Sequence, residues 1–238
     1  MAYTRSSQSN FVDQDVTSGS APVLAVTNMT GSAAGLDSDA TTHAAATGAS
    51  HTYIDQDVTS GASPTFDGTN VTGLRKSIFT STADATVANT TSATTIIGTG
   101  VGTTTLGAGA LGVGSAVYIT IRGHVSDTAN PTLDILCSLG GTTVCSTGAI
   151  TIGNISSDYF EVKVEIVCRT TGASGTVVAS GEFAYENSNV MDGGGMVKAA
   201  ATTIDTTGTL AIAVTAQWGT ASASNTITGQ VVSVETLN

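Results

Sequence analysis

The chain of 238 residues has only seven Lys plus Arg, three Cys, three Pro and one Trp, and its formal net charge is −11. An acidic surface repels phosphate backbones and anionic lipid headgroups, so we expect no nucleic acid and no membrane among its partners. The first ten residues contain no apolar run that would make a secretory signal. No apolar stretch reaches the roughly 18 residues needed to cross a bilayer. We therefore expect synthesis in a cytoplasm.

The three cysteines are Cys137, Cys145 and Cys168. Their odd number, in a chain made in a reducing compartment, argues against a disulfide scaffold. Cys137 and Cys168 alternate in phase with apolar neighbours, which predicts that both are small core residues. No CxxC pair or nearby histidine pattern accompanies them, so we expect neither a metal site nor a cofactor.

What the chain has in abundance is Thr, Ser, Ala, Gly, Val and Ile, a composition typical of β-structure. Apolar and polar residues alternate over 117–125 and 159–169, and further strands are predicted within 132–139, 176–185, 209–218 and 225–237. Glycine- and Asn-containing stretches such as MDGGG are interpreted as turns. The pattern predicts an all-β fold, a jelly-roll-like two-sheet sandwich over 75–238 with Trp218 in its core.

The first third of the chain contains a duplicated segment of 21 residues. One copy begins at Phe11 and the other at Tyr53, and 12 of the 21 positions are identical. Ordering a residue costs roughly 1–2 kcal/mol, which a segment with three or four apolar side chains cannot offset alone. We therefore expect the copies to be stabilised by oligomerisation, with identical segments from several chains wrapped about one axis.

The second copy, DQDVTSGASPTFDGTNVTG (55–73), resembles a repeat of bacteriophage fibre proteins, where it accompanies trimeric shafts. Three later segments resemble the β-sandwich tip of the same class of virion proteins: STADATVANTTSATTIIGTGVGTTTL, VCRTTGASGTVVASGEF and LAIAVTAQWGTASASNTITGQVVSVETLN. The resemblance implies a homotrimeric structural component on the exterior of a phage virion. Similar modules occur on head fibres and on tail fibres, so the location stays open.

These features divide the chain into an N-terminal arm (1–10), repeat 1 (11–32), a linker (33–52), repeat 2 (53–74) and the sandwich (75–238). Repeat 1 departs from repeat 2 in its apolar residues, which would be a liability if exposed on a thin shaft. We assign it to docking on a phage capsid or tail protein through Phe11, Val12, Leu24, Val26 and Met29. We assign repeat 2 to the trimer shaft through Tyr53, Ile54, Val58, Phe66 and Val71.

Two functional hypotheses remain open. The first is a short trimeric head fibre or decoration protein attached to the capsid through its N-terminus, which the presence of only two repeats favours. The second is a tail-fibre tip, an adhesin that recognises a host surface glycan or protein. A bacterial surface adhesin is disfavoured, because the sequence shows no signal peptide or anchor.

Other motifs favour plain structural interpretations. GAGALGVG (107–114) matches a dinucleotide-binding pattern, but a strand follows it where that site needs a helix. The duplicated DQD carboxylates could hold a hard cation, although solvated turns are the better interpretation: Asp13, Asp15, Asp55 and Asp57. The histidines are dispersed, and an axial metal on a trimer would need one of them: His43, His51 or His124.

No nucleophile motif is present, and the glutamates of the predicted strands lack the buried, paired setting of catalytic carboxylates. We therefore expect that the protein is not an enzyme. Aromatic residues make up only 5% of the chain, so stacking platforms for glycans are few. Three tyrosines are candidates for surface contacts with a receptor: Tyr118, Tyr159 and Tyr185.

Overall fold

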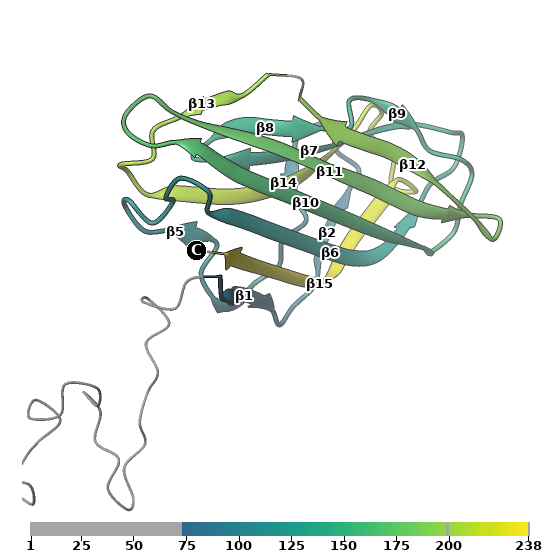
Figure 1. The fold of residues 1–238 in the computed structure, drawn as a ribbon. Coiled ribbons are helices and arrows are strands. Elements are labelled where there is room, and N and C mark those ends of the chain that lie inside the picture. The colour runs from purple at the N-terminus through teal and green to yellow at the C-terminus, as the bar shows by residue number, and fades with distance from the viewer. Residues whose placement is uncertain (1–72, 199, 238) are drawn as a thin grey trace, which may run out of the picture. The chain divides into compact units, whose positions relative to one another are not determined.

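The computed structural model describes residues 73–198 and 200–237, and within these ranges every regular element is a β-strand (Figure 1). The strands are β1 (Arg75–Ser81), β2 (Ala85–Ala88), β3 (Thr94–Thr95), β4 (Gly100–Gly102), β5 (Thr105–Leu106), β6 (Ala116–Ser126), β7 (Thr132–Leu139), β8 (Thr142–Ser146), β9 (Ile150–Thr151), β10 (Asp158–Thr170), β11 (Gly175–Asn187), β12 (Val190–Val197), β13 (Thr202–Ile204), β14 (Leu210–Trp218) and β15 (Thr226–Leu237). The predicted all-β class is confirmed.

The strands form two antiparallel sheets that face each other as a sandwich (Figure 1). The larger sheet has nine strands in the order β12-β11-β10-β6-β15-β1-β4, with β13 paired to β11 and β2 paired to β15. The smaller sheet has six strands in the order β3-β14-β7-β8, with β5 and β9 paired to β14 and β7. This distribution differs from a regular jelly roll, which uses eight strands.

The core lies between the two sheets and follows directly from the alternation of the long strands. In β10, Phe160, Val162, Val164 and Ile166 are buried, while the intervening Lys163 and Glu165 are exposed. The smaller sheet contributes Leu133, Ile135 and Leu139 of β7 and the fully buried Trp218 of β14. The predicted core positions Cys137, Cys168 and Trp218 are confirmed, and Cys145 is buried as well.

The MDGGG stretch, predicted to be a turn, lies inside β12, so that prediction is wrong. Gly193 has φ of +146° and sits opposite Ala184 of β11, where a Cβ atom would collide with the carbonyl oxygen of Phe183. The glycines therefore allow close strand approach rather than a reversal of the chain. The turn lies earlier, at Ser188 and Asn189, which both have positive φ.

The first and the last described strands pair with each other. Arg75 of β1 lies opposite Leu237 of β15, and β1 also pairs with β4 on its other side. In Figure 1, β1 (dark blue) runs beside β15 (yellow). Whatever precedes Gly73 is thus joined to the sandwich at the same place where β15 ends.

Candidate functional site

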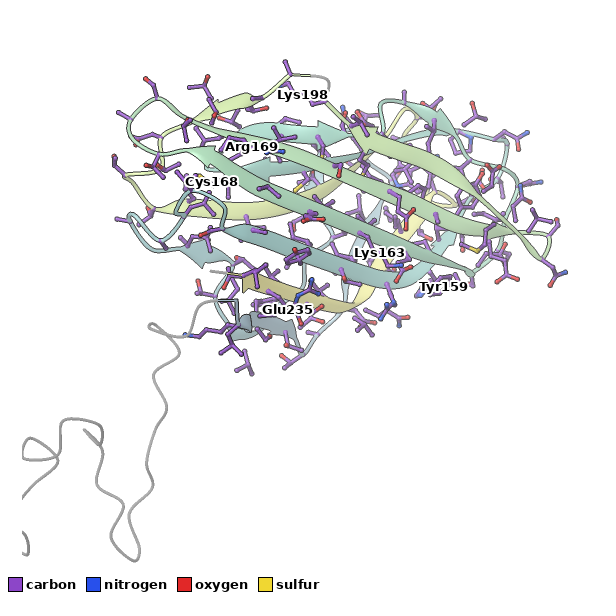
Figure 2. All side chains as sticks on the ribbon, in the orientation of Figure 1. Tyr159, Lys163, Cys168, Arg169, Lys198 and Glu235 are labelled. Carbon is purple, nitrogen blue, oxygen red and sulfur yellow. The ribbon has the colours of Figure 1, made fainter. Side chains whose placement is uncertain are left out.

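The outer face of the nine-stranded sheet carries a shallow trough of about 450 Å³. Side chains of five neighbouring strands line it, and Figure 2 shows two of them, Lys163 and Glu235, on this face. We call this surface the trough and define it by Arg75, Tyr118, Thr120, Lys163, Glu165, Ser180, Glu182, Ser233 and Glu235.

The strand register places the trough residues in cross-strand rows. Glu165 of β10 lies opposite Tyr118 of β6 and Ser180 of β11. Glu235 of β15 lies opposite Tyr118 on its other side, which extends the row across four strands. In the next row, Lys163 lies opposite Thr120 and Glu182. Residues from positions 118 to 235 of the sequence therefore meet on one surface.

A stacked cation closes one end of the trough. The guanidinium carbon of Arg75 lies 3.8 Å from the centroid of the Tyr118 ring, and its Nη1 lies 3.4 Å from Oε2 of Glu235. Arg75 is half-exposed, so the pair with Glu235 contributes little stability. Its main effect is to hold the guanidinium over the ring, which orients both side chains toward the trough.

An ion-pair cluster borders the other end. Nζ of Lys163 lies 2.6 Å from Oε2 of Glu161, and Nε of Arg122 donates a hydrogen bond of 2.7 Å to Oε1 of the same carboxylate. Burial raises the pKa of Glu161, but the hydrogen bonds and charges of Lys163 and Arg122 outweigh it and lower the pKa overall. A carboxylate held ionised in this way cannot serve as a general acid near neutral pH.

Between the two ends, the floor consists of short side chains with hydroxyl groups, namely Thr120, Ser180 and Ser233. Glu165 lies opposite Ser180 in the strand register and makes no ion pair with any residue of 73–198 or 200–237. The trough thus offers charged groups of both signs, hydroxyls and one aromatic ring. Such a surface can exchange hydrogen bonds with a neutral polyhydroxylated ligand.

A buried carboxylate lies outside the trough, at one end of the sandwich. Asp127 is 2% exposed, and its Oδ1 accepts a hydrogen bond of 3.0 Å from the main-chain N–H of Ile155. Burial raises the pKa of Asp127, partly offset by main-chain hydrogen bonds. Its Oδ2 has no hydrogen-bond partner in the described part of the chain. Within that part, no group of three His, Cys, Asp or Glu side chains is placed to hold a metal ion.

The three tyrosines that are candidates for surface contacts differ in their exposure. Tyr118 lines the trough, and Tyr159 is 40% exposed at the start of β10. The prediction of a surface contact is wrong for Tyr185, which is 1% exposed and stacks on Phe183 at a centroid distance of 5.6 Å. Its hydroxyl accepts a hydrogen bond from the N–H of Gly153 and donates one to Asp192, so the polar tip is satisfied inside.

The remaining motifs have plain structural roles where they are described. The GAGALGVG stretch forms turns between β5 and β6, and no helix follows it. His124 is half-buried on β6, opposite Tyr159 and Thr228. The predicted docking and shaft residues lie outside the described residues, as do the DQD carboxylates, His43 and His51: Phe11, Val12, Leu24, Val26, Met29, Tyr53, Ile54, Val58, Phe66 and Val71.

Comparisons with known proteins add little to this surface. No family model and no curated protein matches the chain. One solved structure, described as the CBM2 module of Lactobacillus casei BL23 phage J-1 evolved Dit, matches with 12% identity over 69% of this chain and 97% of that chain. The TM-score is 0.31, a likeness too low to carry fold details or function over to this chain. No helix of the described residues is long and apolar enough to span a membrane.

Proposed function

We propose that the chain is a structural component of a bacteriophage virion, a short homotrimeric fibre or decoration protein attached to the capsid through its N-terminus. The observation that carries this proposal is the division of the chain. A duplicated segment too small to bury a core of its own precedes a sandwich that buries an extensive core within a single copy. An anchor that needs assembly and a tip that folds alone are the two parts that a short fibre requires.

The attachment of the sandwich supports the same proposal. The chain enters the sandwich at Arg75, opposite Leu237, so a stalk would join the tip at one point. The described surface away from this point and from the contact between the three sandwiches would then face solvent, and the net charge of −11 would keep neighbouring fibres from associating. The arrangement is that of a domain displayed on a tether.

The oligomeric state gives the first test. Light scattering on the purified full chain should give three times the monomer mass of 23.5 kDa. A mass of 23.5 kDa that does not change with concentration would contradict the trimer. Mixing tagged and untagged chains before assembly provides a control, because trimers should yield two mixed species in addition to the two pure ones.

Attachment is tested with particles that lack the native protein. The full chain should decorate them, whereas a chain without residues 1–32 should remain a folded trimer and fail to attach. A chain without residues 75–238 should attach weakly, because the sandwiches help the repeats to hold the three chains together and the avidity of three linked anchors is lost without them. Full occupancy by the chain without residues 1–32 would show that docking lies elsewhere. Immunogold label confined to the tail tip would show that the protein attaches to the tail and not to the capsid.

The trough favours a second candidate function, a tail-fibre tip that binds a host surface glycan. Sugar hydroxyls donate to carboxylates such as Glu165 and accept from Lys163 and from the serine and threonine hydroxyls of the floor. Calorimetry with a panel of purified neutral bacterial cell-wall polysaccharides tests this role. Glu165→Ala should weaken binding at least tenfold, while Glu186→Ala, on the same sheet but outside the trough, should not. Equal binding by both variants would show that the trough is not the glycan-binding site.

A further inference from the structure

Two of the three cysteines lie directly opposite each other on neighbouring strands. Cys137 of β7 pairs in register with Cys145 of β8, and both side chains are buried, at 0% and 2% exposure. The register between these strands shifts after Cys137, with Val144 as the extra residue of a β-bulge. Val144 and Cys145 are consequently both buried, which brings the thiol of Cys145 to the core side where Cys137 already lies.

This placement suits a cross-strand disulfide. Directly opposed residues of an antiparallel pair have Cα atoms about 4.5–5.5 Å apart. Disulfides span Cα distances of about 4.4–6.8 Å, so the register places the two residues within the range that a disulfide bridges. Cys168, on β10 of the other sheet, instead directs its thiol to the carbonyl oxygen of Thr170 at 3.4 Å.

The two thiols also interact electronically. The hydrogen bond between them, together with burial, raises the pKa of Cys137, whereas the same hydrogen bond lowers the pKa of Cys145. A thiolate at Cys145 is therefore stabilised by the thiol of its neighbour. The thiolate is the nucleophile of thiol–disulfide exchange, and Cys145 lies on β8 at the end of its sheet path, so we take Cys145 as the first sulfur to react.

Access to the pair follows from the sheet order. β8 ends the path β3-β14-β7-β8, so it pairs with β7 on one side only. β8 also has just five residues. A short edge strand opens locally at lower free energy than the central strands, and opening of β8 exposes Cys145 without unfolding the sandwich.

We propose that Cys137 and Cys145 form a disulfide when the protein meets a small-molecule disulfide such as oxidised glutathione. The Sγ of Cys145 attacks one glutathione sulfur, the glutathione disulfide breaks, and the first glutathione leaves as a thiol. The Sγ of Cys137 then attacks the Sγ of Cys145 and releases the second glutathione. Two protein thiols are oxidised, one glutathione disulfide is reduced, and the two thiol protons pass to the departing glutathiones.

The bond would fasten the edge strand β8 to β7, and it requires neither capsid attachment nor glycan binding. It would leave the chain reduced in a cytoplasm and cross-linked in an oxidising medium. The odd cysteine count, which argues against a disulfide framework, is compatible with one conditional bond and one permanent thiol.

The full chain incubated with oxidised glutathione tests the proposal by mass spectrometry. The tryptic peptide of 123–163 contains both cysteines and no internal Lys or Arg, and it should lose the mass of two hydrogen atoms. Chymotrypsin, which cleaves after Leu139, should then leave two fragments that remain joined until reduction. The oxidised protein should unfold at a temperature roughly 5 °C higher than the reduced protein.

Matched variants distinguish a specific bond between Cys137 and Cys145 from unspecific oxidation of the cysteines. Cys168→Ala should form the bond as the original chain does, whereas Cys145→Ala and Cys137→Ala should not. Because slow opening of β8 could delay the reaction, the chain is also refolded from denaturant in a glutathione redox buffer. If the refolded protein retains three thiols that react with an alkylating agent, or if its bonds involve Cys168, the proposal is wrong.

Discussion

The guanidinium of Arg75 lies over the ring of Tyr118 although the two residues sit on strands that do not pair with each other. β15 runs between β1 and β6, so the side chain of Arg75 crosses above it to reach the ring. The contact therefore ties the first described strand to the centre of the sheet in addition to its main-chain pairing with β15.

We expect Tyr118→Leu to destabilise the sandwich by about 0.5–1 kcal/mol, the usual value of a cation–π contact at an exposed site. Tyr118→Phe keeps the ring and should keep most of this stability. Urea unfolding of both variants measures the difference, and Arg75→Gln in each background completes a double-mutant cycle. Equal losses in Phe and Leu variants would show that the ring face makes no contribution.

Replacement of Glu161 by Gln should make the stability less dependent on acidic pH. The pKa of Glu161 is lower in the folded chain than its ordinary value of 4.5. Its contribution is therefore present above that value and is lost as pH falls through the lower folded pKa. Chemical unfolding at several pH values below 5 should show a shallower acid loss for Glu161→Gln than for the original chain. Glu182→Gln, whose carboxylate lies 3.9 Å from Lys163, is the control and should keep the acid loss.

For Asp127 we expect the opposite dependence of folding stability on pH. Its pKa is raised above the ordinary 3.8 by burial, so the folded chain binds this proton more tightly than the unfolded chain does. The stability that protonation provides is fully present below 3.8 and is lost as pH rises through the folded pKa. Asp127→Asn removes the charge and can keep the acceptor for Ile155. We expect its stability relative to the original chain to increase as pH rises from about 4 to 7. A pH-independent difference would contradict the assignment.

Trp218 offers a test of how the core tolerates an unsatisfied donor. The side chain is 1% exposed, and its Nε1 has no hydrogen-bond partner among the described residues. Trp218→Phe removes that donor together with part of the buried volume, so the two effects oppose each other, and the net loss should stay below about 1.5 kcal/mol. Trp218→Ala should cost about 3–5 kcal/mol. Thermal and urea unfolding of both variants provide the comparison.

The long strands were predictable because their two faces differ chemically. β10 alternates apolar residues with Glu161, Lys163 and Glu165, and only a half-buried strand explains such a pattern. The alternation in β11 also indicated that Tyr185 is buried, because Tyr185 lies two residues after the buried Phe183 and so points to the same face of the strand. Its hydroxyl made a surface role attractive, yet Gly153 and Asp192 satisfy it inside.

β12 and the trough could not be predicted from the sequence for different reasons. Three consecutive glycines in β12 provide no alternation, so local pattern favours a turn and only pairing with β11 makes them a strand. The trough depends on which strands are neighbours, and the register that sets Glu235 beside Tyr118 beside Glu165 is not encoded in any one segment. Arg75 belongs to the only adjacent pair of basic residues, but nothing in the sequence places it over a ring.

The pairing of β1 with both β15 and β4 has a mechanical consequence. Any pull on the sandwich from the chain that precedes Gly73 is transmitted through β1. Along the strand axis, that pull loads five residue pairs with β15 and three with β4 at the same time. Perpendicular to the sheet, it would detach the same pairs one by one, beginning at Arg75 and Leu237. The pairing of β1 is therefore strong against tension along the strand and weak against tension perpendicular to the sheet, so the direction of the pull on β1 sets the force that the sandwich withstands.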